Sequence, residues 1–135
     1  MDPFALAPEI AAESTSIAEL GLSLLLAKTT APYPWLILVP RRSVTEITDL
    51  AAEDRGMLIE EVATASRALR AVTGCEKLNI AALGNIVRQL HVHLIARSPT
   101  DPGWPEPVWA AAAAPPLTGD AIGRLVAAVR AEISA

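Results

Sequence analysis

The sequence has a single cysteine and no run of basic residues. Cys75 has no partner within the chain for a disulfide, so a reducing compartment is expected. Lys and Arg number 11 against 15 Asp and Glu, which gives a formal net charge of −4. Nucleic-acid polymers are therefore not expected as partners. A small phosphorylated ligand remains compatible with this charge, because a pocket of backbone amides can bind phosphate without net positive charge.

Long hydrophobic runs are also missing. The longest apolar stretches, such as WLILVP at 35–40, are far shorter than a membrane span. The opening residues MDPFALAPEI carry an early acid and lack a positively charged region before an apolar stretch, so no secretory signal is expected. These features predict a soluble, cytoplasmic protein with no membrane partner.

The apolar content, in contrast, is high. Hydrophobic residues make up 52% of the 135 residues, which is enough to build one substantial core. We expect a single domain over 1–135. Its core spans about 16–97, and a segment rich in Pro and Trp leads to a C-terminal helix within 98–135.

Hydrophobic spacing predicts the elements of this domain. Strand-like stretches occur at 16–28, broken by Gly21, and at 35–40, and the two are expected to pair. An amphipathic helix follows from about residue 48 and ends at Gly74, because apolar residues recur there every three or four positions: Met57, Leu58, Val62, Ala65, Leu69 and Val72.

Two more strands and a last helix complete the prediction. The strands are expected at 77–83 and 88–97, and Thr118 is a suitable N-cap for the last helix. Strands and helices do not alternate as in βαβ units, so the sequence predicts an α+β domain with a mainly antiparallel sheet.

The only two histidines, His91 and His93, lie two residues apart in the stretch QLHVHLIAR. On a strand, residues two apart project from the same face, so the two imidazoles and Gln89 should point together. Three interpretations remain open at this point. The histidines face solvent on a half-exposed strand, or they bind a metal with a distant third ligand such as Asp101 or Glu106, or they act in catalysis near neutral pH.

The stretch KLNIAALGNIVRQLHVHLIAR resembles the signature of the histidine triad (HIT) family, in which three histidines alternate with apolar residues. Gln89 stands in place of the first of these histidines, as in one bacterial subgroup, and the resemblance covers about 16–97. It implies a HIT-like α+β fold with about five strands, one long helix and a C-terminal helix.

The resemblance also implies a function. Family members are usually homodimers that bind a purine nucleotide or dinucleoside polyphosphate and act as nucleotidyl hydrolases or transferases without cofactor or metal. Their middle histidine attacks the α-phosphate, a role that falls on His91, and His93 would hydrogen-bond phosphate or leaving-group oxygens. Contacts to the nucleotide and its phosphate would come from four residues: Asn79, Gly84, Asn85 and Ile86.

The chain departs from the family pattern at two positions. In the family, the first histidine of the triad acts largely through its backbone carbonyl, which orients the nucleophile. Gln89 stands at that position here and retains the carbonyl. Trp35 occupies the place of a further histidine that contributes to the phosphate site in many members, which makes the pocket more apolar. The alternative to an enzyme is therefore a nucleotide-binding or regulatory module on the same fold with little or no turnover.

Overall fold

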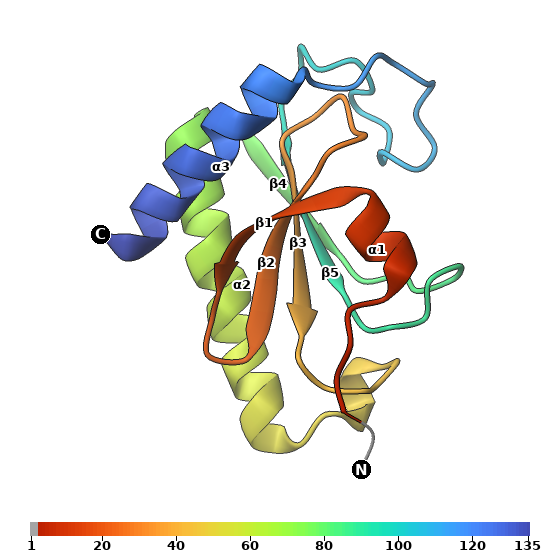
Figure 1. Ribbon diagram of the computed structural model, residues 1–135. Coiled ribbons are helices and arrows are strands. Elements are labelled where there is room, and N and C mark those ends of the chain that lie inside the picture. Colours follow the sequence, from red (N-terminus) through yellow and green to blue (C-terminus); the bar gives the residue numbers. More distant parts are fainter. Residues whose placement is uncertain (1–2) are drawn as a thin grey trace.

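Five strands form one antiparallel sheet in the computed structural model of the protein, which describes residues 3–135 (Figure 1). The order of the strands is β1-β2-β3-β5-β4. Their bounds are β1 Ser14–Glu19, β2 Ser23–Lys28, β3 Trp35–Pro40, β4 Lys77–Ala81 and β5 Val92–Arg97. The predicted α+β class with a five-stranded antiparallel sheet is confirmed. Within residues 3–135, no helix has the length and apolar character needed to cross a membrane.

The break expected at Gly21 separates two strands of a hairpin. β1 pairs with β2, and β2 pairs with β3 as the sequence predicted. The register of the β1–β2 ladder shifts between Ser16 and Ala18, where β1 bulges. At this outer edge the Arg130 side chain donates to the carbonyls of Ile17 and Ser16, so the edge of β1 is partly covered.

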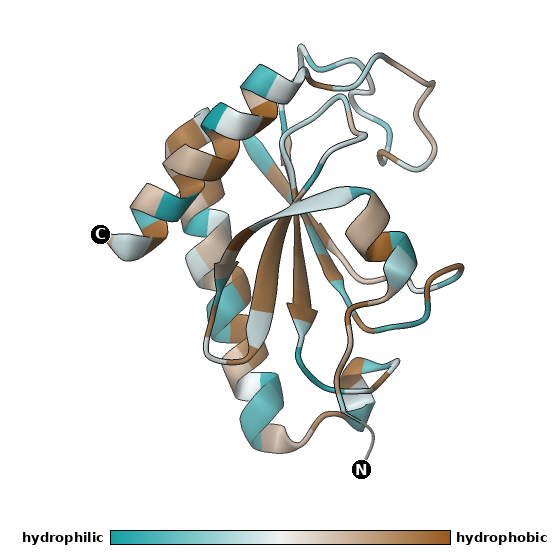
Figure 2. Ribbon diagram, viewed as in Figure 1, coloured by the Kyte–Doolittle hydropathy of each residue, from teal (hydrophilic) through white to brown (hydrophobic). Residues whose placement is uncertain are grey.

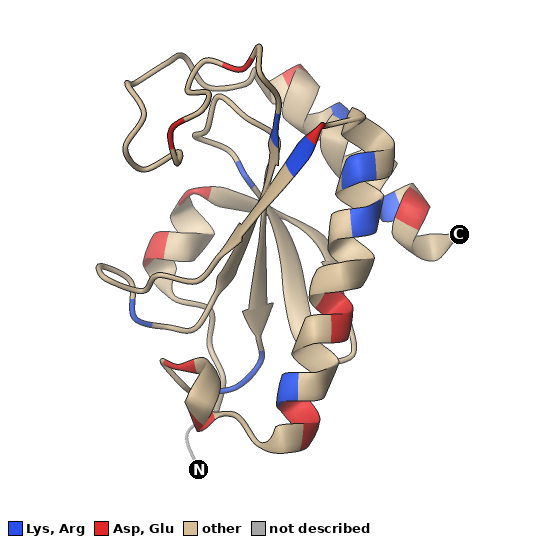
Figure 3. Cartoon of the chain, turned by 180° about the vertical axis from the view of Figure 1, so that it is seen from behind, with Lys and Arg blue, Asp and Glu red and all other residues tan. Residues whose placement is uncertain are grey.

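Two long helices cover one face of the sheet (Figure 1). Helix α2 spans Ala52–Thr73 and ends at Gly74, whose φ of 64° is the left-handed conformation that favours glycine at a helix C-terminus. Acidic residues occupy its first turn and Arg70 its last, which complements the helix dipole (Figure 3). Helix α3 spans Gly119–Ser134, and the Thr118 hydroxyl accepts from the Ala121 amide at 3.1 Å. Both predicted helices are confirmed.

Two short helices were not predicted. Helix α1, Pro8–Ala12, lies on the face of the sheet opposite α2 and α3 (Figure 1), and a 3-10 helix, η1, spans Ile47–Asp49. Five residues are too few for a recognisable apolar period, so hydrophobic spacing cannot reveal α1. The folded chain thus has ordered structure ahead of residue 16, where the predicted core began.

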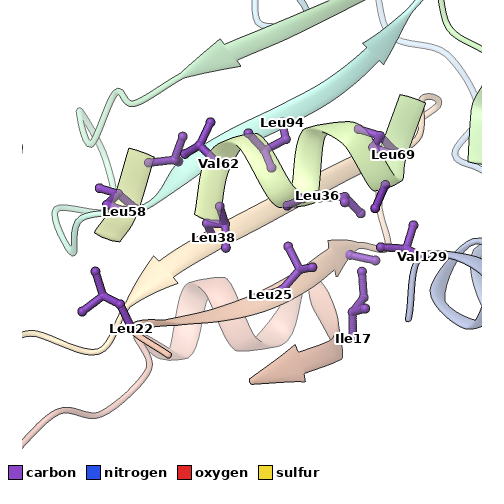
Figure 4. Packing of buried hydrophobic residues seen from close by; sticks show 14 of the residues in the cluster. Ile17, Leu22, Leu25, Leu36, Leu38, Leu58, Val62, Leu69, Leu94 and Val129 are labelled. Atoms are coloured by element: carbon purple, nitrogen blue, oxygen red, sulfur yellow. The ribbon is translucent and has the colours of Figure 1, made fainter. Parts of the chain in front are cut away.

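The central strands β2, β3 and β5 are buried on both faces, and β2 and β3 are among the most apolar parts of the ribbon (Figure 2). One cluster fills the space between the sheet, α2 and α3, and includes Leu36, Leu69, Leu94 and Val129 (Figure 4). A second cluster lies on the other face and includes Ile10, Tyr33, Trp35 and Ile95. The predicted alternation of side chains around the histidines is confirmed for the face of the sheet toward α2 and α3. The four apolar residues that alternate with Gln89, His91, His93 and Ile95 all join the first cluster: Leu90, Val92, Leu94 and Ala96.

The predicted strand at 88–97 is too long. β5 begins at Val92, β4 ends at Ala81 rather than Leu83, and residues 82–91 form an irregular connection. The Leu90 amide donates to the Val44 carbonyl at 3.0 Å, outside the sheet ladder. His91 therefore precedes the strand and His93 lies within it.

Candidate active site

His91 and His93 lie side by side and are buried. Each is 8% exposed, and their ring centroids are 4.8 Å apart at an interplanar angle of 76°. The interpretation of two histidines on a solvated strand face is wrong, because the sheet carries packed side chains on both faces at this point. Two imidazoles held together away from bulk water need specific partners.

The partner of His91 is a backbone carbonyl. His91 Nδ1 lies 2.6 Å from the Gln89 carbonyl oxygen. A carbonyl only accepts, so in the neutral ring Nδ1 carries the proton and Nε2 keeps its lone pair. The structure thus contains the contact that the family resemblance implied for Gln89. An imidazole in this tautomer presents a nucleophilic nitrogen.

The Gln89 side chain forms hydrogen bonds away from His91. Its Oε1 accepts from the Ala7 amide at 2.8 Å, and its Nε2 donates to the Ala5 carbonyl at 2.7 Å. The side-chain amide therefore pairs with the backbone ahead of α1. The backbone of Gln89 orients His91 while its side chain anchors the N-terminal segment, a double role for which the sequence contains no signal.

His93 is the centre of a ring cluster formed by His91, His93, Trp35 and Trp109. Trp35 and Trp109 approach His93 edge-on, with centroids at 5.3 and 5.0 Å, and also contact each other. The indole N–H of Trp35 donates to His93 Nδ1 at 2.9 Å. Trp109, from the C-terminal segment, packs on His93 while remaining 47% exposed itself.

Burial and positive neighbours lower the pKa of His93 from 6.5 to about 4. Loss of hydration is the largest cause, followed by the neighbouring His91 and Lys28. Lys28 also lies over the ring of Trp35 at 5.3 Å and pairs with Glu13 at 3.0 Å. Near pH 7, His93 is a neutral imidazole.

This lowered pKa predicts a pH dependence of stability. Between pH 6.5 and 4 the unfolded chain binds a proton at residue 93 more readily than the folded chain, so the free energy of unfolding falls as the pH falls through that window. We expect the His93→Gln variant, whose side chain can still accept from Trp35, to lose about 1 to 2 kcal/mol less than the unmodified protein between pH 6.5 and 5. Urea unfolding at several pH values measures this difference. Parallel pH profiles for the two proteins would contradict it.

Two cavities meet at His91. The larger, of about 410 Å³, is lined by both histidines, Trp109, Glu13 and the connection at 83–87. The smaller, of about 150 Å³, is lined by His91, Gln89, residues 45–48 and the backbone around Gly84. A ligand bound at His91 can therefore extend into either cavity, of which the larger is the more apolar and the smaller is bordered by Thr45 and Thr48.

The turn around Gly84 borders both cavities. Gly84 has φ of 77°, a left-handed conformation that favours glycine. Within residues 3–135, none of the backbone N–H groups at 84–88 donates to a protein acceptor. Asn85 and Ile86 line the larger cavity with Gly84, and Ile86 is 94% exposed. A row of free amides beside an imidazole is suited to bind an anionic oxygen.

Asn79 lies elsewhere. Its Oδ1 accepts from the Arg97 guanidinium at 3.0 Å, and it is not among the residues that line the two cavities at His91. Arg97, only 2% exposed, also binds Asp101 and the Glu106 carbonyl. These contacts hold the segment that carries Trp109 against the sheet. The nucleotide contact expected of Asn79 stays a prediction.

Three residues at the site escaped the sequence prediction: Glu13, Lys28 and Trp109. They come from the α1–β1 turn, from β2 and from the C-terminal segment, and no spacing rule connects such distant positions. The metal interpretation also lacks its third ligand, since no group of three or more His, Cys, Asp or Glu side chains in the described chain is arranged to hold a metal ion. The Asp101 carboxylate is already bound to Arg97.

The chain is an α+β domain with two buried imidazoles side by side next to a glycine turn, and comparisons with known proteins identify a family with this fold. The HIT domain model matches residues 9–100. The chain therefore belongs to the HIT domain family. No match was found among curated proteins.

Solved structures of bacterial histidine triad proteins resemble the whole chain. One from Bradyrhizobium japonicum is 41% identical with a TM-score of 0.93, covering 98% of this chain and 99% of that one. One from Sinorhizobium meliloti 1021 is also 41% identical, with a TM-score of 0.88 and coverages of 93% and 94%. One from Marinobacter aquaeolei VT8 is 35% identical, with a TM-score of 0.91 and coverages of 98% and 98%.

Proposed function

We propose that the protein is a nucleotidyl hydrolase or transferase that acts at the α-phosphate of a nucleoside phosphoramidate or dinucleoside polyphosphate, with His91 as the nucleophile. The observation that carries this proposal is the contact of His91 Nδ1 with the Gln89 carbonyl, which leaves Nε2 free beside two cavities. Membership of the HIT family, which includes nucleotide hydrolases and transferases, supports the same chemistry.

The proposed reaction has two steps. In the first, His91 Nε2 forms a bond to the α-phosphorus while the P–N or P–O bond to the leaving group breaks, and an amine leaving group takes up a proton from solvent water. In the second, water attacks phosphorus and releases a proton to solvent, the Nε2–P bond breaks, and nucleoside monophosphate is released with the imidazole restored. The amides of the turn at Gly84, Asn85 and Ile86 would stabilise charge on the phosphoryl oxygens.

His93 would assist as a hydrogen-bond donor to phosphate or leaving-group oxygens. Its neutral state near pH 7 suits donation rather than the transfer of a full proton. Gln89 would contribute its carbonyl, and the protein would belong to a bacterial subgroup that has glutamine in the first triad position.

Turnover of defined substrates tests this proposal. The protein is incubated with adenosine 5′-phosphoramidate or diadenosine tetraphosphate, and release of adenosine monophosphate is followed. Release from either substrate supports the proposal. Saturable nucleotide binding without release would instead support the alternative of a nucleotide-binding module, and absence of both would exclude a nucleotide function.

We also propose that the protein is a homodimer joined at β4. This strand ends the sheet, and Ile80 on it is 50% exposed. Ile59 of α2, 61% exposed, and Ile80 both line an apolar groove of about 270 Å³ next to that edge. An exposed apolar edge strand is suited to pair with a second copy of itself.

We expect Ile80→Lys to shift the protein from dimer to monomer in sedimentation velocity, because it places a charge at the centre of the edge. Met57→Lys is the matched control. Met57 is 39% exposed and lies toward the β1–β2 turn, near Gly21. A dimer unaffected by Ile80→Lys would contradict an interface at β4.

A further inference from the structure

The contact between Trp35 and His93 determines where the proton of His93 lies. Trp35 is 6% and His93 8% exposed, so water does not compete freely for their nitrogens. An indole N–H can only donate, and it points at His93 Nδ1 from 2.9 Å. Nδ1 must therefore accept, which puts the single proton of the neutral ring on Nε2.

The two histidines are consequently held in opposite tautomers. His91 is protonated at Nδ1 because its partner there, the Gln89 carbonyl, only accepts. His93 is protonated at Nε2 because its partner, the Trp35 indole, only donates. One ring thus offers a lone pair on Nε2 and its neighbour an N–H on Nε2, although the two side chains are chemically identical and their centroids are 4.8 Å apart.

We propose that Trp35 is a positioning residue that locks His93 as a neutral donor through Nε2, so that only His91 is available as nucleophile. A second protonation, at His93 Nδ1, would set two donors against each other and break the bond to the indole. A histidine or glutamine at position 35 can both donate and accept, so it would not enforce one tautomer. The catalytic consequence rests on the proposed function, whereas the tautomer itself does not.

The charges around His93 also favour the neutral form of its ring. Lys28 on β2 lies over the ring of Trp35, and His91 lies ahead of β5. Glu13, from the α1–β1 turn, is the acid that lines the larger cavity at the histidines, and it is paired with Lys28. The lowered pKa of His93, about 4, agrees with a ring that remains neutral.

The test uses the fact that the chain has only two histidines. In protein labelled with ¹⁵N-histidine, two-bond ¹H–¹⁵N correlation spectra at pH 7 show two ring patterns, and these distinguish Nδ1-H from Nε2-H tautomers. We expect one Nδ1-H pattern, from His91, and one Nε2-H pattern, from His93. His91→Gln assigns the two. An Nδ1-H or doubly protonated His93 in the unmodified protein would overturn the proposal without any variant at position 35.

The Trp35→Phe variant then tests the effect of the indole N–H by removing it. We expect the single Nε2-H pattern of His93 to be replaced by a mixture of tautomers, and its titration midpoint to rise by about one pH unit. Trp109→Phe is the matched control, because Trp109 packs edge-on against His93 without a hydrogen bond to it. We expect that variant to keep the Nε2-H pattern. Equal spectra for the two variants would contradict a lock by Trp35.

The kinetics of the Trp35→Phe variant measure the catalytic consequence of the proposed tautomer of His93. Trp35→Phe is expected to lower kcat/KM by on the order of 10-fold, with its acidic limb moved to higher pH, because a donor to the phosphoryl group is no longer held. A shift in the spectra without a change in turnover would confine Trp35 to a structural role. Absence of turnover in the unmodified protein would remove the proposed function and leave the tautomer assignment standing.

Discussion

Replacement of His91 by alanine is expected to lower turnover of a nucleoside phosphoramidate by on the order of 10³-fold or more, because it removes the atom that forms the covalent intermediate. The other of the two imidazoles in the chain, His93, offers no equivalent nitrogen, since its Nδ1 is occupied by the Trp35 indole. Initial rates of monophosphate release, measured at saturating substrate, give the effect on kcat.

Mass spectrometry of the acid-sensitive intermediate, trapped by rapid quenching at alkaline pH, extends this test. A nucleotidyl adduct is expected on the unmodified protein and on His93→Gln, which retains His91 but turns over more slowly. No adduct is expected on His91→Ala. Far-UV circular dichroism and thermal unfolding of His91→Ala check that the fold is intact. An adduct or undiminished turnover in His91→Ala would exclude His91 as the nucleophile.

The largest expected effect on stability comes from Arg97. Its guanidinium is 2% exposed and binds both oxygens of Asp101, at 2.7 and 3.2 Å, in addition to Asn79 and the Glu106 carbonyl. Arg97 also lies over the ring of Tyr33 at 5.0 Å. Removal of the guanidinium leaves the Asp101 carboxylate without its opposite charge in a site with little water, although the amides of Ser98 and Gly103 still donate to it. Arg97→Ala is therefore expected to lower the free energy of unfolding by about 3 to 5 kcal/mol.

A second pair in the chain provides the control. Arg42 binds both oxygens of Asp54 at 2.8 and 3.2 Å, nearly the same geometry, but the Arg42 side chain is 48% exposed. We expect Arg42→Ala to cost no more than about 1 kcal/mol, because water replaces the lost partner. Guanidinium chloride unfolding of both variants measures the difference. Equal losses would show that burial does not determine the contribution of Arg97.

Arg97 is expected to matter for the site as well. It joins β5 to the segment that carries Trp109, and Trp109 covers His93. The guanidinium is also the main reason that the pKa of the Asp101 carboxyl is lowered, despite the opposing effect of desolvation. The contribution of this pair to stability is therefore present above the ordinary pKa of an aspartate and is lost at lower pH.

The helices and the central strands could be predicted because their signals are local. The apolar spacing from Met57 to Val72, with Gly74 after it, defines α2 to within a few residues. Thr118 marks the start of α3 for the same reason. The exact end of β4 and start of β5 could not be predicted, because Ala82, Leu83 and Leu90 continue the apolar pattern of the two strands and only tertiary contacts, such as the bond from Leu90 to Val44, take them out of the sheet.

The pairing of His91 and His93 was predictable from residue parity, whereas the role of the Gln89 carbonyl was implied only by the resemblance to the HIT family. The burial of the two histidines was not predictable, since it depends on α1, on Trp35 and on a tryptophan that lies 16 residues beyond His93 in the sequence.

The sequence by itself determined which side chains share a face, where the two long helices begin and end, and that an imidazole pair lies beside a glycine turn. These properties follow from backbone periodicity over a few residues. Only the tertiary structure decided the hydrogen-bond partner of each imidazole: the Gln89 carbonyl accepts at Nδ1 of His91, and the Trp35 indole N–H, from another strand, donates to Nδ1 of His93. Such differences arise from partners that meet only when the sheet is assembled, so residue type and spacing cannot reveal them.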